Sequence, residues 1–466
     1  ASLREVTGAF SIAVLDAATP GMVVAARRVS PLLVGRADGV TFLASDVPAI
    51  LEHTRDLVAV EDGQVAVLTP GGLVLRDLDG REVDPTPLTV EWDVETAALG
   101  GHPDFMTKEM FEQPEAVRAT LAARRDPDGR IVLDELRLTD DELREVDRVV
   151  LVGCGSSYHA ALVGKYAIER WARLGCEVDI ASEFRYRDGV VDRRTLCVGV
   201  SQSGETIDTI MALREARARG ARSLAVCNVV GASMARESDA ALYARAGLEI
   251  GVASTKTVLA LIVALELLAL RLAQVRGTMD DDEVGRAFEQ LVGLPELIAE
   301  ALKGAEHVLE VAESLADATT FFFLGRQVGL PVALEGALKL KELSYLHAEG
   351  YPGGELKHGP IALIEPGTVV VAVLTDDELR GELRDKLVSN VAEVTARGAS
   401  VVVVHAADDE EAATFGDWSI PVPRTTTIAS PVLAIVPLQL LAYHLATLRG
   451  LDVDRPRNLA KTVTVE

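Results

Sequence analysis

Two glycine-containing loops of the sequence are rich in hydroxyl groups. They are Gly153–Ser157 (GCGSS) and Ser201–Thr206 (SQSGET). Hydroxyls, an amide and exposed backbone N–H groups at the positive end of a helix are suited to holding a phosphate group. The second loop lacks the lysine of a P-loop, so a nucleoside triphosphate is not expected. Alternatively, these Ser and Thr side chains only cap helices, and Ser254 has the same two interpretations.

Ionisable residues gather in the second half of the chain. Lys339 and Glu342 are three residues apart in a helical pattern, so they share one face of the helix. His358 lies in a predicted loop, and Lys461 lies in a C-terminal segment that is neither helical nor of low complexity. Such groups can move protons in a reaction. The structural alternatives are a surface ion pair, a histidine bonded to the backbone and a solvated tail.

Apolar runs place the two hydroxyl loops. From residue 148 onward, continuous apolar runs at 148–152, 196–200 and 223–227 alternate with helical patterns. This alternation predicts a parallel sheet that is covered on both faces. Each hydroxyl loop follows a strand. Both loops are therefore expected at the edge of the sheet where open α/β folds bind ligands.

The same order of elements then recurs. Gly325 lies 172 residues after Gly153, and Ser430 lies 176 residues after Ser254. Three further apolar runs match the first three in order, at 320–325, 369–374 and 400–404. Offsets this similar predict a duplicated domain, with two doubly wound units packed together.

The first 147 residues do not follow this pattern. Residues 1 to 90 show short alternating segments separated by Gly, Pro and Asp, which predicts an antiparallel β layer. Residues 91–147 are predicted to form a linker with one helix over 105–125.

Composition limits the class of protein. The chain has 466 residues, of which 48% are hydrophobic, and its formal net charge of −25 argues against nucleic acid or an anionic membrane as a partner. The apolar stretch 258–275 contains Glu266 and Arg271, which favours a buried helix over a membrane span. Four cysteines without a CxxC pair, and no His/Cys cluster at metal spacing, favour reduced thiols in a cytoplasmic protein.

Six motifs together resemble the glutamine–fructose-6-phosphate aminotransferase (isomerising) family, the glucosamine-6-phosphate synthases. They cover nearly all of 103–466 and read CGSSY at 154–158, SQSGET at 201–206, VASTK at 252–256, EGALKLKELSYLHAE at 335–349, GELKHGP at 354–360 and PRNLAKTVTVE at 456–466. FLASD at 42–46 and EDG at 61–63 resemble the later part of the family's glutaminase domain. One mild departure is Ser156, where the family usually has threonine.

The resemblance implies an α/β fold with two doubly wound, parallel-sheet SIS (sugar isomerase) domains related by duplication. A partial antiparallel-β segment of an Ntn-type glutaminase precedes them. The expected domains are a glutaminase remnant at 1–90, a linker and entry helix at 91–147, a first SIS domain at 148–305, and a second SIS domain with a catalytic tail at 306–466.

The resemblance also implies a reaction, the conversion of fructose 6-phosphate to glucosamine 6-phosphate with ammonia from glutamine. Nine residues match the family's contacts to the sugar or its phosphate: Ser156, Ser157, Ser201, Gln202, Ser203, Thr206, Val252, Ser254 and Ala460. No metal or organic cofactor is expected, because an imine between enzyme and sugar serves as the electron sink.

Four residues match catalytic groups of the family. Lys461 matches the lysine that forms an imine with the C2 ketone, and Glu342 matches the base that moves a proton from C1 to C2. Lys339 matches the group that shuttles the O1 proton. His358 matches the ring-opening residue, which the family takes from a partner subunit, so a homodimer is expected.

The glutaminase half of the family uses an N-terminal cysteine as its nucleophile. This sequence begins at Ala1, and its first cysteine is Cys154. We therefore expect these 466 residues to lack the glutamine-hydrolysing site and to keep only the isomerase half. Glutamine would then be a substrate only through the missing N-terminal part.

Two alternatives stay open at this point. A sugar-phosphate-binding regulator with tandem SIS domains would keep the hydroxyl loops, but it has no need of the four catalytic matches together. An ammonia-dependent sugar-phosphate isomerase or deglycase would lack the β-rich residues 1–90. The sequence has both sets of features, which favours the synthase.

Overall fold

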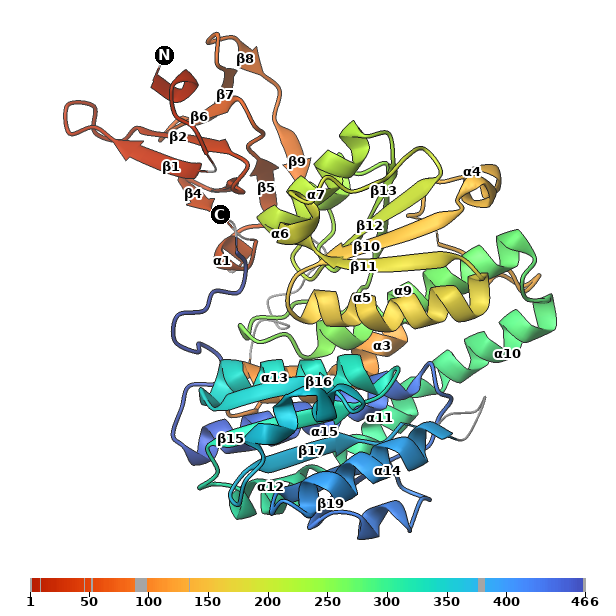
Figure 1. Ribbon diagram of the computed structural model, residues 1–466. Coiled ribbons are helices and arrows are strands. Elements are labelled where there is room, and N and C mark those ends of the chain that lie inside the picture. The colour runs from red at the N-terminus through yellow and green to blue at the C-terminus, as the bar shows by residue number, and fades with distance from the viewer. Residues whose placement is uncertain are drawn as a thin grey trace.

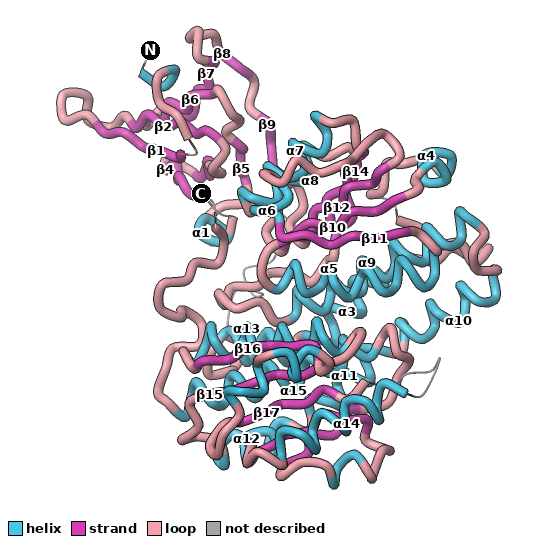
Figure 2. Tube along the Cα trace, in the orientation of Figure 1, coloured by secondary structure: helices cyan, strands magenta, loops and turns pink. Residues whose placement is uncertain are grey.

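The computed structural model describes residues 2–8, 10–45, 47–51, 53–88, 99–133, 135–375 and 382–463. Within them the strands form four sheets, two antiparallel near the N-terminus and two parallel (Figures 1 and 2). The domain boundary expected between residues 90 and 91 lies outside the described residues, and the last motif is described as far as residue 463.

An N-terminal unit of two antiparallel sheets occupies residues 10–88. Its strands are β1 (Phe10–Leu15), β2 (Val23–Arg28), β3 (Leu33–Ala37), β4 (Val40–Ala44), β5 (Asp56–Ala59), β6 (Gln64–Thr69), β7 (Gly72–Asp77), β8 (Glu82–Val83) and β9 (Thr86–Leu88), with short helices η1 (Ser2–Arg4) and α1 (Pro48–Leu51). One sheet has the order β1-β2-β6-β7-β8 and the other β4-β3-β5-β9. Ala25 and Ala66 of the first pack with Val34 and Val58 of the second, so the predicted antiparallel layer is a pair of layers with its own core.

Two α/β units follow, each built on a five-stranded parallel sheet. The first α/β unit contains β10 (Arg148–Gly153), β11 (Gly175–Ile180), β12 (Thr195–Ser201), β13 (Arg222–Cys227) and β14 (Ala240–Tyr243), in the order β11-β10-β12-β13-β14. The second contains β15 (Thr320–Gly325), β16 (His347–Pro352), β17 (Val369–Val373), β18 (Ser400–Ala406) and β19 (Trp418–Val422), in the order β16-β15-β17-β18-β19. The identical order confirms the predicted duplication.

Helices cover both faces of each sheet. The first α/β unit has α5 (Ser156–Ala167), the π-turn η3 (Ile168–Ala172), α6 (Ala181–Phe184), α7 (Ile207–Ala218), α8 (Ser233–Glu237) and α9 (Lys256–Arg276). The second has α12 (Ala305–Ser314), α13 (Gly329–Ser344), η4 (Glu355–His358), η5 (Pro360–Leu363), α14 (Glu382–Thr395), η6 (Ala412–Thr414) and α15 (Ser430–Leu448). Before and between them lie α2 (Phe105–Phe111), α3 (Gln113–Leu121), α4 (Asp140–Glu145), α10 (Asp281–Val292) and α11 (Leu294–Leu302).

Strand β10 shows why the inner strands are continuous apolar runs. Successive side chains of a strand point to opposite faces of its sheet. Val149 and Leu151 enter the core that α5 and α9 share, whereas Val150 and Val152 enter a second core on the other face. The outer strands β11, β16 and β19 are only partly buried and mix polar with apolar residues. Continuous apolar runs therefore predict the three inner strands of each sheet, and these edge strands have no such run.

The helix predicted over 105–125 is wrong in its length. It is two helices, α2 and α3, which meet at Glu112. Pro114 lies in the first turn of α3. Proline lacks the N–H that would continue the hydrogen bonds of a preceding helix, so the chain turns there.

Helix α13 lies where the two α/β units meet (Figure 2). It packs against α5 of the first unit and against α15 of its own unit. The apolar core is continuous across this contact, because Ala160 of α5 and Ala337 of α13 belong to the same buried cluster. The two sheets are therefore held as one packed body, and a residue on α13 has a defined position relative to both.

The long helices α9 and α15 are apolar enough to span a membrane by length and composition, but most of each is buried inside the protein. This burial supports the predicted core helix over 258–275. An apolar helix that contacts other elements all round is typical of the centre of a large core.

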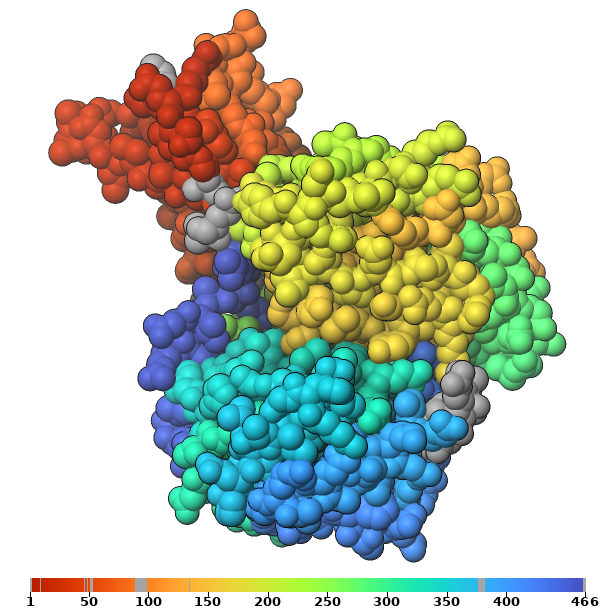
Figure 3. Space-filling model, in the orientation of Figure 1, coloured from red at the N-terminus to blue at the C-terminus, as the bar shows by residue number. Residues whose placement is uncertain are grey.

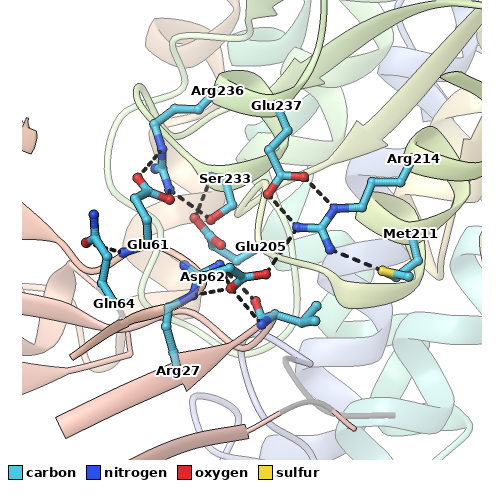
Figure 4. Close-up of polar contacts among 11 residues, drawn as sticks. Arg27, Glu61, Asp62, Gln64, Glu205, Met211, Arg214, Ser233, Arg236 and Glu237 are labelled. Carbon is cyan, nitrogen blue, oxygen red and sulfur yellow. Dashed lines mark hydrogen bonds and ion pairs between the residues drawn. The ribbon is translucent and has the colours of Figure 1, made fainter. Parts of the chain in front are cut away.

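Charged residues hold the N-terminal unit on the first α/β unit (Figure 4). Arg236 of α8 pairs with Glu61 at 3.3 Å, and Arg214 of α7 lies 3.7 Å from Asp62. Beside these pairs Leu88 of β9 packs against the backbone at Gly231, where a Cβ would lie 2.4 Å from the leucine Cδ1. Gly231 also has φ +76°, so two independent constraints favour glycine there.

Glu266 in the middle of α9 gives a test of this core. The carboxyl group is fully buried, and within the described residues neither oxygen has a hydrogen-bond partner. Burial raises the pKa of Glu266 well above its ordinary value of 4.5. We expect Glu266→Met to raise the free energy of unfolding at pH 7 by roughly 1–3 kcal/mol, because an unpaired polar group leaves the core.

The pH dependence of that gain has a definite sign. The folded-state pKa of Glu266 is raised, so the parent protein loses stability relative to the variant as pH rises from 4.5 through the folded pKa. The difference in free energy of unfolding between the variant and the parent should grow by at most about 1.4 kcal/mol per pH unit. Urea unfolding between pH 6 and pH 8.5 measures it. The control is Glu306→Gln, a substitution of an exposed glutamate. If Glu266→Met and Glu306→Gln have the same free energy of unfolding at every pH, the prediction is wrong.

Candidate functional site

A pocket of about 260 Å³ opens at the carboxyl edge of the first parallel sheet, facing α13. Four separate parts of the chain line it: the loops after β10 and β12, the segment before α9, helix α13 and the C-terminal segment. The lining residues are Cys154, Gly155, Ser156, Ser157, Gln202, Ser203, Thr206, Val252, Ser254, Lys339, Glu342, Leu459, Ala460, Lys461 and Val463.

The loop after β12 is shaped by a buried serine. Ser201 Oγ accepts a hydrogen bond from the Gly204 N–H at 3.0 Å and lies 3.0 Å from Thr206 Oγ1. Gly204 has φ +67°, and a Cβ there would lie 2.5 Å from the Cβ of Ala232, so the turn requires glycine. Gln202, Ser203 and Thr206 line the pocket just before α7 begins.

The loop after β10 brings a second helix start to the same edge. Gly155 has φ +55° and precedes α5, whose first residues are Ser156 and Ser157. The free N–H groups and the positive end of the helix dipole at each helix start favour an anion. Two such helix starts, with hydroxyls beside them, therefore face one pocket. The predicted meeting of the two hydroxyl loops is confirmed.

The segment before α9 adds a further hydroxyl and a buried carboxylate. Ser254 Oγ is buried and has no hydrogen-bond partner among the described residues, so it is free to bind a ligand. Glu249 is buried nearby, where one of its oxygens accepts hydrogen bonds from the N–H groups of Thr255 and Thr257, each at 3.0 Å. These bonds fix the carboxylate at the start of α9.

Helix α13 contributes a buried ammonium group. The Lys339 side chain is 1% exposed, and its Nζ lies 2.5 Å from Glu342 Oε2 and 3.7 Å from Glu335 Oε1. Burial alone would lower the pKa of Lys339, but the two carboxylates raise it above its ordinary value. Lys339 is therefore a charged proton donor beside a carboxylate that reaches the pocket.

The C-terminal segment crosses from the second α/β unit to the first along the surface (Figures 1 and 3). It leaves the second unit at Tyr345, the residue that ends α13, where the Arg457 N–H donates to the Tyr345 hydroxyl at 2.8 Å. It reaches the first unit at α7, where the Ile207 N–H donates to the Val463 carbonyl at 3.3 Å. The segment thus covers one side of the pocket.

Lys461 points from this segment towards the segment before α9. Its Nζ donates to Glu249 Oε2 and to the Gly251 carbonyl, both at 2.7 Å. Burial alone would raise the pKa of Glu249, but Lys461 and the backbone N–H groups hold it at about 2. In the same cluster, burial and the charge of Glu249 raise the pKa of Glu109 to about 7. A lysine amine is thus held beside carboxylates inside the pocket.

The structure brings together eleven of the thirteen predicted site residues. Ser201 lies beneath its loop and does not line the pocket. His358 is exposed on η4 of the second α/β unit and lies outside the pocket of its own chain. The role predicted for His358 requires a second subunit, so it stays a prediction.

Sequence reasoning missed the carboxylates that hold the two lysines. Glu335 lies four residues before Lys339 on the same helix, and this spacing is a readable signal. Glu249 and Glu109 have no such signal, because their partners come from distant parts of the chain.

Comparisons with known proteins agree with this architecture. The SIS domain family matches residues 142–271 and 314–449. A glutamine–fructose-6-phosphate aminotransferase (isomerising) from Streptomyces coelicolor (strain ATCC BAA-471 / A3(2) / M145) is 51% identical over 459 residues, which cover 98% of this chain and 75% of the relative. The chain belongs to the glutamine–fructose-6-phosphate aminotransferase family.

Solved structures of similar proteins match the two SIS domains of this aminotransferase family member. The C-terminal domain of glucosamine-fructose-6-phosphate aminotransferase from Francisella tularensis has a TM-score of 0.73 and 40% identity, and the match covers 77% of this chain and all of that one. Glucosamine-6-phosphate deaminase from Thermotoga maritima has a TM-score of 0.59 and 27% identity, over 77% of this chain and 99% of that one.

Proposed function

We propose that this aminotransferase family member converts fructose 6-phosphate to glucosamine 6-phosphate with ammonia. The observation that carries the proposal is the pocket itself, where a phosphate cradle faces Lys339, Glu342 and Lys461. Turnover of fructose 6-phosphate with an ammonium salt, followed by detection of glucosamine 6-phosphate, tests it directly.

The domain division follows the sequence analysis. We place a glutaminase remnant at 1–90, a linker at 91–147 and SIS domains at 148–305 and 306–466. The start of β10 at Arg148 and of α12 at Ala305 supports the last two boundaries.

The phosphate group of the substrate binds at the starts of α5 and α7. Ser156, Ser157, Ser203 and Thr206 line this end of the pocket with hydroxyls, and the two helix starts direct the positive ends of their dipoles towards it. Charge-assisted hydrogen bonds of this kind are the stronger class, so they hold one end of the sugar without a lysine or arginine. Gln202 adds a side-chain amide at the phosphate end, and Val252, Ser254 and Ala460 line the remaining wall and contact the sugar.

Lys461 forms the imine with the sugar. Its amine must lose a proton before it attacks C2 of the open-chain ketose, and its contacts with Glu249 and the Gly251 carbonyl hold it at the wall of the pocket. The C2 oxygen leaves as water when the imine forms. Once protonated, the imine activates C2 for attack by ammonia, which forms a bond to C2 while the bond from C2 to the Lys461 amine breaks. The new iminium at C2 withdraws electrons from C1, so a proton on C1 becomes acidic.

Glu342 and Lys339 move the protons of the isomerisation. The Glu342 carboxylate takes the proton from C1 and returns it to C2, while Lys339 exchanges a proton with O1. The 2.5 Å contact between them places an acid and a base at one end of the pocket. We also propose that His358 opens the sugar ring in the pocket of a partner subunit, which makes the active form a homodimer. The exposure of His358 on η4 supports this.

Each alternative function leaves part of the structure unexplained. A sugar-phosphate-binding regulator needs the hydroxyl loops but not a buried lysine between two carboxylates, which is costly to keep without a role. A deglycase is a closer alternative, since the Thermotoga maritima deaminase shares the fold at 27% identity. The two-layered N-terminal unit, seated on the first SIS domain, favours the synthase.

Glu342→Gln tests the proposed carbon base. We expect turnover of fructose 6-phosphate to fall about 10²- to 10⁴-fold, the usual contribution of a general base. Substrate affinity should change little, because Glu342 lies opposite the phosphate cradle. Kinetics with Glu306→Gln, a surface change of the same chemistry, give the baseline. Turnover of Glu342→Gln within the error of that control would remove Glu342 from the mechanism.

Borohydride trapping tests the proposed imine. We expect fructose 6-phosphate and borohydride to label Lys461, because reduction converts the imine into a stable secondary amine. Peptide mapping by mass spectrometry identifies the labelled lysine. Lys461→Arg keeps the positive charge but cannot form the imine, so it should give no adduct and no turnover. An adduct on another lysine of the active protein would contradict the assignment.

A polypeptide of these 466 residues should release no glutamate from glutamine. Burial raises the pKa of the Cys197 and Cys227 thiols to about 12, so neither supplies a thiolate nucleophile near neutral pH. Interconversion of fructose 6-phosphate and glucose 6-phosphate should still occur, since it needs only ring opening and proton transfer. Coupled assays for glutamate and glucose 6-phosphate measure both outcomes. Release of glutamate would contradict the predicted lack of glutaminase activity. A folded dimer that does not interconvert the two hexose phosphates would contradict the predicted isomerase activity.

A further inference from the structure

Four ionisable side chains form a row across the contact between α5 and α13. His159 Nδ1 of the first SIS domain lies 2.7 Å from Glu335 Oε2 of the second. The row continues along α13 through Lys339 to Glu342, by the 3.7 Å and 2.5 Å contacts described above. His159 is not among the residues that line the pocket, and the mechanism above leaves it without a role.

The carboxylate of Glu335 determines which nitrogen of His159 carries a proton. Burial alone would raise the pKa of Glu335, but Lys339, His159 and Ser156 lower it below its ordinary value. An ionised carboxylate only accepts hydrogen bonds. Nδ1 of His159 is therefore the donor, and a neutral imidazole is sufficient for this role.

Each oxygen of Glu335 has a separate task. Oε1 accepts a hydrogen bond from Ser156 Oγ at 2.8 Å and faces the Lys339 ammonium, whereas Oε2 is held by His159. The Glu335 side chain is 1% exposed, so water cannot replace a lost donor. Without His159, Oε2 would be a buried, unpaired acceptor, and such an oxygen is attracted to the nearest cation. That cation is Lys339, which would be drawn away from Glu342.

We propose that His159 is a positioning residue for the proton-transfer step, which fixes Glu335 by a hydrogen bond from Nδ1 so that Lys339 stays beside Glu342. The inference rests on the proposed function, because it assigns His159 a place in that same reaction. It predicts that the rate of proton transfer depends on the position of one N–H donor and not on the charge of the imidazole.

Two polar substitutions separate these requirements. The side-chain amide of His159→Asn can place an N–H where Nδ1 lies, whereas that of His159→Gln places it one bond further out, near the position of Nε2. Both variants are polar and of moderate size, so both should fold. The matched control is His307→Gln, since His307 also pairs with a glutamate, Glu310 at 3.4 Å, but on the surface.

The assay is conversion of fructose 6-phosphate to glucose 6-phosphate, with kcat and KM measured separately. We expect His159→Gln to lower kcat about 10- to 100-fold, because misplacing a reacting group by an ångström costs that much. KM should stay within about twofold, since Ser156 is the one described residue of the phosphate cradle that has a hydrogen bond to Glu335. His159→Asn should retain kcat within about threefold of the parent, and His307→Gln should match the parent.

The parent protein and Glu342→Gln, measured in the same assay, separate failure of this inference from failure of the proposed function. If the parent protein shows no turnover of fructose 6-phosphate, the proposed function is wrong, and if Glu342→Gln keeps full turnover, Glu342 is not the carbon base. If Glu342→Gln is impaired but His159→Gln is not, only the role of His159 is overturned. A His159→Asn protein as slow as His159→Gln, or a change confined to KM, would also overturn it.

Discussion

The buried ammonium of Lys339 is the interaction on which the candidate site depends. A lysine that is 1% exposed is tolerated only when carboxylates neutralise it, and Glu335 and Glu342 do so from the same helix. Glu335 is in turn bonded to Ser156 and His159 of the other SIS domain. One charged group therefore links α13 to the start of α5, and the pocket between the two domains keeps its shape because this link is too costly to break.

The site could be predicted from the sequence where local patterns carried the information. Parallel strands end at one edge, so the loops after β10 and β12 had to meet, and the spacing of Lys339 and Glu342 placed them on one helix face. The order of apolar runs likewise predicted the duplication. Edge strands such as β11 and β16 lack a continuous apolar run. The break at Glu112 does have a signal in the sequence, Pro114, but proline is also tolerated in the first turn of a helix and the residues on both sides of it are helical.

The remainder depends on contacts between distant residues. Nothing in the last motif indicates that the chain returns to the first SIS domain, or that Lys461 meets Glu249 some two hundred residues earlier in the sequence. The same holds for Glu109, which belongs to no recognisable sequence motif. Its pKa is raised only because the side chain is buried beside Glu249. A buried carboxylate is recognisable as functional only once its surroundings are known, because the sequence records the group and not the burial.

The two copies of the duplicated domain contribute different kinds of residue to the pocket. The first retains the two hydroxyl loops, and α13 of the second brings Lys339 and Glu342 to the same pocket. In the proposed function, substrate binding is therefore encoded in one copy of the duplicated domain and proton transfer in the other. Mutation can alter the sugar that is accepted without disturbing proton transfer, and the reverse, which gives lineages with this architecture a route to new sugar-phosphate reactions by changing one copy at a time.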